Sequence, residues 1–201
     1  MGEYLVEELT EQPLQAMVEI LSAAYVDNGL HLAAFPGEEG DRLTQNRALF
    51  GLAMGMLGGT WLCVRAGSDL VGVLRYAPSP GCIPPPEAQG ELGQVFAANL
   101  GEAGVRVAEW FKSWSDVHPG GKHWHLGPFA VAPEYQGRGI GSLLMEEYCR
   151  RMDQAQEVGY LETDKPRNIR FYEKFGFEVT RQEQVIGATN WFMERMARVA
   201  G

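Results

Sequence analysis

The stretch EYQGRGIGSLL, residues 134–144, places three glycines within five positions and runs directly into an apolar, helix-like segment. The first turn of a helix leaves its amide N–H groups unpaired, and the helix dipole adds partial positive charge there. Glycines lack the Cβ atoms that would hold a ligand away from the backbone. The stretch therefore predicts either a tight turn between a strand and a helix or a cradle for an anion, most often a phosphate.

Two common phosphate-binding patterns do not fit this stretch. No Gly-Lys-Ser/Thr follows the glycines, which excludes a nucleoside-triphosphate P-loop. A dinucleotide site needs G-x-G-x-x-G, and Ser142 stands where the third glycine belongs. Glu162 lies at the distance expected for a ribose-binding acid, but residues 133–136 form a loop where that fold has a tight turn.

The composition limits the class of protein and its partners. The chain has 201 residues, of which 45% are hydrophobic and 21% charged, as in ordinary globular proteins. Its length is most simply one domain over residues 1–201. The net charge of −9 argues against nucleic-acid or anionic-membrane partners, because both need clustered Lys and Arg.

The cysteines and the start of the chain indicate a cellular compartment. Cys63, Cys82 and Cys149 are odd in number and widely spaced, which predicts free thiols in a reducing environment. The acidic start lacks the order of a signal peptide, and no apolar run has the length of a membrane span. We therefore expect a cytoplasmic protein.

Hydrophobic spacing and turn residues predict alternating strands and helices. Residues 78–90 hold five of the eleven prolines and are expected to lack regular structure. The predicted strands cover residues 4–9, two short runs within 60–77, 122–131, 158–163, 177–184 and 189–197. The predicted helices cover 12–25, 42–56, 91–114, 140–156 and 167–176, and Gly101 and Gly104 are candidate breaks in the third of them. Residues 27–41 are expected to form a loop, and Gly127-Pro128 an irregularity in its strand.

The glycine stretch fits the pattern Q-x-x-G-x-G at residues 136–141. Together with FAVAPEYQGRGIGSLLM and RFYEKFGFEV, it resembles the GNAT superfamily of acetyl-CoA-dependent N-acetyltransferases, over about Leu126–Val179. Within the superfamily, HLGPFAVAPEYQGRGIGSLL looks most like the branch that includes puromycin N-acetyltransferase. The resemblance implies an α/β (α+β) fold, a single GNAT-like domain. Its mixed central sheet would have about seven strands flanked by helices, with two central parallel strands splayed apart.

The resemblance also implies a binding site for acetyl-CoA as co-substrate. The amides of residues 137–142 would face the pyrophosphate, and the pantetheine arm would lie between the parted strands 122–131 and 159–163. There, exposed amides of Phe129 and Val131 would bond the pantetheine and the thioester carbonyl. The implied cofactor-binding residues are Phe129, Ala130, Val131, Gln136, Gly137, Arg138, Gly139, Ile140, Gly141, Ser142, Asn168 and Tyr172.

Three positions either depart from the family's pattern or have two interpretations. The family often has Asn seven residues before its tyrosine, where this chain has Lys165. Asn168 is then a weaker cofactor candidate, and Lys165 a candidate for reaching a phosphate. Arg138 is expected either to add charge near the phosphates or to be a solvated surface residue.

The resemblance assigns the chemistry to a few side chains. Tyr172 aligns with the family's general acid, which protonates the departing thiolate; the alternative is a buried structural tyrosine. An amine must be neutral to attack, so a general base is needed, with Glu162 as first candidate and His123 and His125 as others. The His-x-His pair at residues 123 and 125 is also a pattern that metal sites use. We expect none, because no carboxylate or Cys evidently completes the set.

These features predict an N-acetyltransferase that moves an acetyl group from acetyl-CoA to a primary amine by direct attack. The acceptor is expected to be a small cationic molecule, and a homodimer is a further expectation. Two alternatives stay open: a CoA-binding module without turnover, and a transferase that uses another acyl-CoA. The 78–90 segment is either a surface loop or a lid over the acceptor.

Overall fold

The computed structural model describes residues 4–198, which fold into one mixed seven-stranded sheet with seven α-helices. The strands are β1 (Val6–Glu8), β2 (Thr60–Ala66), β3 (Asp69–Pro78), β4 (Trp124–Val131), β5 (Gly159–Thr163), β6 (Glu178–Val185) and β7 (Ala188–Arg195). The helices are α1 (Leu14–Tyr25), α2 (Gly29–Ala34), α3 (Glu39–Met54), α4 (Pro86–Leu100), α5 (Glu102–Val117), α6 (Ile140–Ala155) and α7 (Pro166–Glu173), with one 3-10 turn at Pro133–Tyr135.

The sheet contains one parallel pair of strands, and this pair separates. The strand order is β1-β2-β3-β4-β5-β7-β6, and all neighbours except β4 and β5 are antiparallel. The strands β4 and β5 pair only at Trp124 with Gly159 and at His125 with Tyr160. Beyond these positions the backbone groups on the facing edges lack a partner strand. The predicted fold class, with its two splayed central strands, is confirmed.

Helices cover both faces of the sheet. The apolar residues of α6, together with Tyr172 of α7, pack with strand residues such as Leu62, Leu126 and Leu161 in one core cluster. On the other face, α1 and α3 pack on Trp61 and Val73. The sheet is therefore buried between two helical layers, and the β4–β5 separation lies in its middle.

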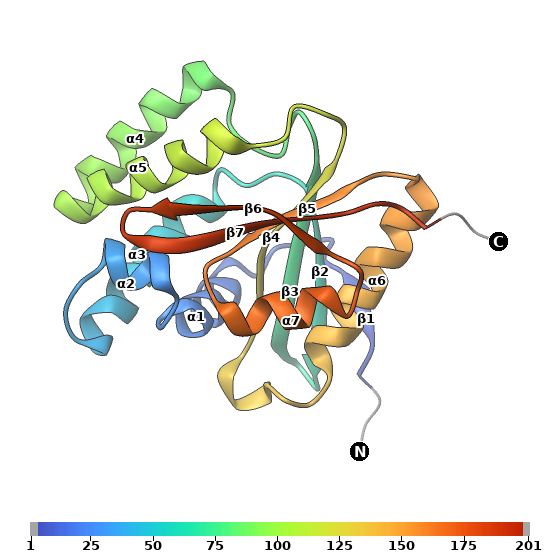
Figure 1. Cartoon of the computed structure of the whole chain (residues 1–201). Coiled ribbons are helices and arrows are strands. Elements are labelled where there is room, and N and C mark those ends of the chain that lie inside the picture. Colours follow the sequence, from blue (N-terminus) through green and yellow to red (C-terminus); the bar gives the residue numbers. More distant parts are fainter. Residues whose placement is uncertain (1–3, 199–201) are drawn as a thin grey trace.

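The helices α4 and α5 form a pair at one end of the molecule, where Figure 1 shows them beside the β6–β7 hairpin. Their apolar residues join α2 and α3 in a third cluster that includes Leu30, Phe96 and Trp110. The indole of Trp114 donates a hydrogen bond to Asn190 of β7, 3.1 Å away, which ties this pair to the sheet. The pair thus closes one end of the space above the strands.

Three predicted segments differ from the structure. The helix expected over 91–114, with Gly101 and Gly104 as candidate breaks, is two helices that meet at Gly101, where φ is +60°. The loop expected over 27–41 contains α2, whose apolar residues are buried in the third cluster, so packing overrides the local loop signals. The segment expected to be irregular over 78–90 includes the start of α4 at Pro86, a position where a helix tolerates proline.

The irregularity predicted at Gly127-Pro128 is present. The register between β3 and β4 shifts between Leu74, which pairs with Phe129, and Tyr76, which pairs with Leu126. The shift lies at the point where β4 leaves β5. None of the helices in residues 4–198 has the length and apolar character needed to cross a membrane.

Candidate active site

The glycine stretch forms a loop that ends on the N-terminus of α6. Gly137 and Gly139 have φ of 75° and 84°, a left-handed conformation that glycine adopts without strain. Gly139 is the N-cap of α6, and no side chain caps this end. The N–H groups of Ile140, Gly141 and Ser142 occupy the first turn, where a helix offers no internal acceptor. The loop therefore presents free donors in a field that favours an anion.

Side chains around this loop stabilise it without filling it. Gln136 donates from Nε2 to the carbonyl of Val131, 3.0 Å away. Arg138 donates to the carbonyl of Glu134 at 2.8 Å, and its guanidinium lies 4.8 Å from the ring centre of Tyr135. A Cβ built on Gly137 or Gly139 would meet no atom within 4 Å. The space beside the loop is open.

One cavity of about 1200 Å³ connects this loop with the opposite end of the molecule. It runs along β4 and β5 where they separate and reaches α4 and α5. Glu162 lines it, as do all the predicted cofactor-binding residues except Arg138, namely Phe129, Ala130, Val131, Gln136, Gly137, Gly139, Ile140, Gly141, Ser142, Asn168 and Tyr172. Residues from distant parts of the sequence are thus brought to one surface.

The gap between β4 and β5 contains a tyrosine that the sequence did not single out. The hydroxyl of Tyr25 donates to the carbonyl oxygen of Phe129 and accepts from the N–H of the same residue, each over 3.2 Å. Burial raises the pKa of Tyr25 to about 12, so its hydroxyl stays protonated. The expectation that the Phe129 amide is exposed is therefore wrong, because Tyr25, at the end of α1, occupies it.

The amide of Val131 also faces the gap. Ala132 donates its N–H to the carbonyl of Val71 on the β3 side. Because successive residues of a strand alternate in direction, the N–H groups of Val131 and Phe129 point away from β3, and that of Ala130 points toward it. Val131 thus presents a donor to the cavity where β5 no longer pairs.

Tyr172, in α7, forms part of the cavity wall. Its side chain is buried, and its hydroxyl makes no hydrogen bond to the described residues. Burial raises the pKa of Tyr172 well above its usual value of 10.0, and the nearby Tyr25, Asp164 and Glu162 add to the effect. The phenol is therefore a protonated group with a free donor.

Glu162 and His125 form a buried ion pair across the beginning of the gap. Oε2 of Glu162 lies 2.7 Å from Nε2 of His125, while Oε1 of Glu162 is buried without a partner. Burial lowers the pKa of His125, but the Glu162 carboxylate and contacts with Cys82 outweigh burial and raise it to about 9. Glu162 thus lines the cavity with one oxygen engaged and one without a partner.

His123, the other predicted candidate base, lies apart from Glu162 in a second cluster. Its Nε2 is 3.6 Å from Sγ of Cys82 and 3.1 Å from Nε2 of His118. No sequence pattern links Cys82 to these histidines, because it lies 36 residues from His118 along the chain. The spacing of His118 and His123, with four residues between them, is one that zinc sites use, and it was an available signal.

The candidates near the start of α7 have partners within the protein. Lys165 forms an ion pair with Asp27, and its side chain is largely buried. The structure therefore engages this ammonium instead of leaving it free for a phosphate. Asn168 donates from Nδ2 to Oγ1 of Thr163 at 3.2 Å, which orients it beside β5.

The end of the cavity beyond the gap is aromatic. Rings from α1, α3, α4 and α5 line it, namely Tyr25, Phe50, Phe96, Trp110, Phe111 and Trp114. The predicted 78–90 segment contributes further wall residues, namely Cys82, Ile83, Pro84, Gln89 and Gly90. The segment therefore forms a wall of the cavity.

Solved structures with this fold include several N-acetyltransferases. A histone acetyltransferase HPA2 and related acetyltransferase from Corynebacterium glutamicum matches with a TM-score of 0.74 and 20% identity, over 99% of each chain. A polyamine N-acetyltransferase from Drosophila melanogaster that forms N-acetylagmatine matches with a TM-score of 0.66 and 11% identity, over 96% of this chain and 100% of that one. The PaiA N-acetyltransferase of Thermoplasma acidophilum, in complex with coenzyme A, matches with a TM-score of 0.58 and 16% identity, over 97% and 99%.

The sequence itself matches a family. The family model described as the acetyltransferase (GNAT) family covers residues 14–177, which include the glycine loop, both separated strands and α7. The narrower resemblance to the puromycin N-acetyltransferase branch stays a prediction. The chain belongs to the GNAT family of acetyltransferases, which are enzymes that use acetyl-CoA.

Proposed function

We propose that this enzyme transfers the acetyl group of acetyl-CoA to a small primary amine by direct attack, without a covalent enzyme intermediate. The observation that carries the proposal is the single cavity that joins an uncapped helix N-terminus, the gap between β4 and β5 and an aromatic pocket. Such a path suits a long cofactor with a diphosphate at one end and a thioester at the other. The acceptor would then meet the thioester at the aromatic end.

The cofactor would be held mainly by backbone groups. The amides of residues 137–142 bind the pyrophosphate, and Gln136 maintains the loop through its bond to Val131. The arm lies along Phe129, Ala130 and Val131, where the Val131 amide is the first free donor and Tyr25 covers the Phe129 peptide. Tyr172 and Asn168 form the opposite side, and Arg138 contributes charge from the loop.

The reaction needs two proton movements. The amine nitrogen attacks the carbonyl carbon of the thioester, and its excess proton passes to the free Oε1 of Glu162, directly or through water. The carbon–sulfur bond then breaks, and the Tyr172 hydroxyl donates a proton to the departing thiolate. The products are an N-acetyl amide and the free thiol of coenzyme A. Cys149 takes no part, because burial raises the pKa of its thiol to about 11.

The aromatic end of the cavity indicates the kind of amine. An alkyl amine has a pKa of about 10.4 and is a cation in solution, which aromatic faces attract. The net charge of −9 also favours approach of a cation. The polyamine N-acetyltransferase that shares this fold supports the same class of acceptor. We therefore propose a small cationic amine with an apolar or aromatic body. A homodimer stays a prediction.

A thiol-release assay tests the proposal. The enzyme is incubated with acetyl-CoA and, in turn, with arylalkylamines, agmatine, polyamines, an aminoglycoside and a basic peptide. Release of coenzyme A that requires one of the amines, with the acetylated amine seen by mass spectrometry, supports acetyl transfer. Calorimetric binding of coenzyme A without turnover on any amine would favour a binding module. Faster turnover with a longer acyl-CoA would show that the longer acyl-CoA, and not acetyl-CoA, is the preferred acyl donor.

A further inference from the structure

Three potential metal ligands meet at the wall of the cavity, outside the groups used for acetyl transfer. Cys82 comes from the loop between β3 and α4, His118 is the C-cap of α5, and His123 immediately precedes β4. Sγ of Cys82 lies 3.4 Å from Nε2 of His118 and 3.6 Å from Nε2 of His123, and the two nitrogens are 3.1 Å apart. Three segments thus converge on a single point through atoms that each carry a lone pair.

The separations match those around a zinc ion. Zinc binds thiolate at about 2.3 Å and imidazole at about 2.0–2.1 Å in a tetrahedron. From these values, sulfur and nitrogen ligands are separated by about 3.6 Å and two nitrogen ligands by about 3.4 Å. The distances among Cys82, His118 and His123 agree with this geometry within a few tenths of an ångström.

The hydrogen bonds around His123 fix its ring for metal binding. Nδ1 of His123 lies 2.8 Å from the carbonyl of Gly121, which can only accept, so Nδ1 carries the proton. In the neutral ring, Nε2 then has a free lone pair that points at Cys82 and His118. A carbonyl behind the distal nitrogen is the usual way in which proteins orient a metal-binding histidine.

Hydrogen bonds alone satisfy this cluster less well than a metal does. His118 can place one proton on Nε2, which must serve either Cys82 or His123, although both are within reach. The thiol adds one further weak donor. A cation at the centre satisfies the lone pairs of all three residues at once.

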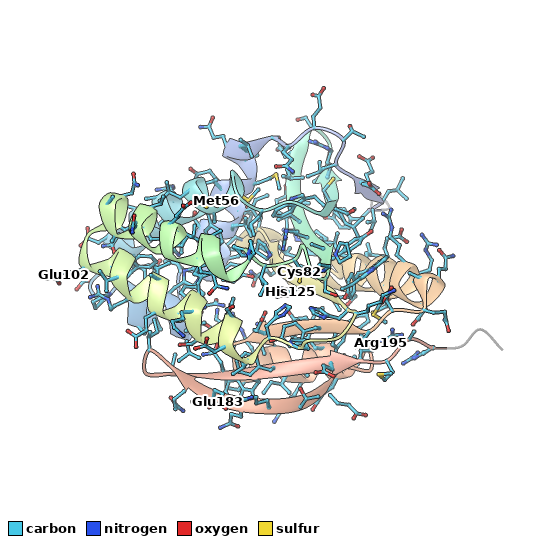
Figure 2. The ribbon with its side chains drawn as sticks, turned by 90° about the horizontal axis from the view of Figure 1, so that it is seen from above. Met56, Cys82, Glu102, His125, Glu183 and Arg195 are labelled. Atoms are coloured by element: carbon cyan, nitrogen blue, oxygen red, sulfur yellow. The ribbon has the colours of Figure 1, made fainter. Side chains whose placement is uncertain are left out.

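The surroundings leave room for a fourth ligand on the cavity side. Cys82, His118 and His125 all line the cavity, and Figure 2 shows Cys82 and His125 next to each other near the centre of the molecule. The ring of Tyr160 packs on all three histidines at centre distances of 5.3–5.5 Å and keeps them in place.

We propose that Cys82, His118 and His123 bind one zinc ion, whose fourth position faces the cavity and His125. The ion fixes the loop between β3 and α4 to the end of α5 and the start of β4. It thereby holds the wall of the acceptor pocket that residues 82–84 form. Zinc binding does not depend on the acetyl transfer proposed above and can be measured without turnover.

The first experiment measures zinc content. The full chain is loaded with zinc chloride, desalted and analysed by elemental mass spectrometry. We expect about one zinc per chain in the wild type, and a dissociation constant at least about 100-fold higher in Cys82→Ala and His123→Ala. Cys149→Ala is the matched control, since Cys149 is a buried cysteine on α6, and it retains the metal. A zinc-free wild type, or a Cys82→Ala variant that binds as tightly, overturns the proposal.

Two measurements on the unaltered chain cover the case in which a variant fails to fold. Cobalt added in place of zinc should give the intense visible absorption of a tetrahedral site together with a thiolate charge-transfer band. Zinc should also slow alkylation of Cys82 by iodoacetamide, located by peptide mass spectrometry, and leave the rates at Cys63 and Cys149 unchanged. Octahedral cobalt spectra, or alkylation of Cys82 at the same rate with and without zinc, contradict the site.

Discussion

The hydroxyl of Tyr25 forms two hydrogen bonds to one residue, donating to the carbonyl of Phe129 and accepting from its N–H, both over 3.2 Å. A helix side chain therefore takes the place of the strand that β4 loses when β5 departs. Tyr25→Phe leaves both backbone groups without a protein partner in a partly buried place. We expect the free energy of unfolding to fall by about 1–3 kcal/mol, measured by urea denaturation.

The matched control for this variant is Tyr4→Phe. Tyr4 precedes the edge strand β1 and packs, partly buried, against the core, and its hydroxyl makes no hydrogen bond within residues 4–198. Loss of that hydroxyl should change the free energy of unfolding by less than about 0.5 kcal/mol. If Tyr25→Phe is no less stable than Tyr4→Phe, the hydroxyl does not support the Phe129 peptide.

Tyr172 differs from Tyr25 in that its hydroxyl has no partner. Tyr172→Phe should therefore leave the melting temperature and the affinity for coenzyme A unchanged. The departing thiolate would lose its proton donor, and we expect kcat to fall by about 100-fold or more. Steady-state kinetics with the best amine of the panel measure the effect. An unchanged kcat would remove Tyr172 from the chemistry.

Glu162 is paired with His125 through Oε2, and its Oε1 has no partner among the described residues. Glu162→Gln keeps the shape but cannot accept the proton of the attacking amine. We expect kcat/KM for the amine to fall by about 100-fold, with binding of coenzyme A unchanged in calorimetry. Glu173→Gln, an exposed change on α7, should behave as the wild type. If the two variants are equally active, a group other than Glu162 is the general base.

The glycine loop, the strand before it and the helix after it could be predicted from the sequence because their signals are local. The backbone at positions 137 and 139 has a positive φ, which glycine adopts without strain. The apolar spacing after these glycines predicts α6. The separation of β4 and β5 followed from the family resemblance and from the Gly127-Pro128 irregularity. The loop and α6 depend on residues within about one helix length of each other, whereas the separation of β4 and β5 was implied by the resemblance.

The other features depend on contacts between distant segments. Gly104 lets α5 approach α4 so closely that a Cβ there would lie 2.0 Å from the carbonyl oxygen of Phe96, and no local pattern shows this. Tyr25 has the spacing of an ordinary core residue on α1, and only the fold places it at Phe129. Cys82 meets His118 and His123 for the same reason. Pairings of this kind are decided by packing and not by sequence spacing.

The anion cradle can be tested with a pair of variants at Gly139. Asn and Asp tolerate the left-handed conformation better than other side chains, and a Cβ at this position meets no atom within 4 Å. Gly139→Asn and Gly139→Asp should therefore fold alike. The aspartate places a negative charge beside the free amides, so it should bind coenzyme A at least about 10-fold more weakly than the asparagine in calorimetry. Equal affinities would show that the pyrophosphate lies elsewhere.

His31 makes the stability of the fold depend on pH in the acidic range. Burial lowers its pKa from 6.5 to about 4, the positive charge of Lys165 adds to this, and a hydrogen bond to Asn46 opposes it. The unfolded chain thus binds a proton at His31 below pH 6.5, whereas the folded chain does not until about pH 4. The contribution of His31 to the free energy of unfolding is complete above pH 6.5. We expect about 3 kcal/mol of that free energy to be lost as the pH falls toward 4.

Urea denaturation of the wild type and His31→Asn at pH 7 and at pH 4.5 measures this contribution. Asparagine can replace the bond from Nδ1 to Oδ1 of Asn46, which spans 2.8 Å, and it does not titrate. The variant loses packing against the rings of Tyr25 and Phe50 and is less stable at pH 7. Its further loss on going to pH 4.5 should nevertheless be smaller than that of the wild type, because the carboxylates that titrate there are common to both. Equal losses would mean that His31 is protonated in the folded chain as readily as in the unfolded one.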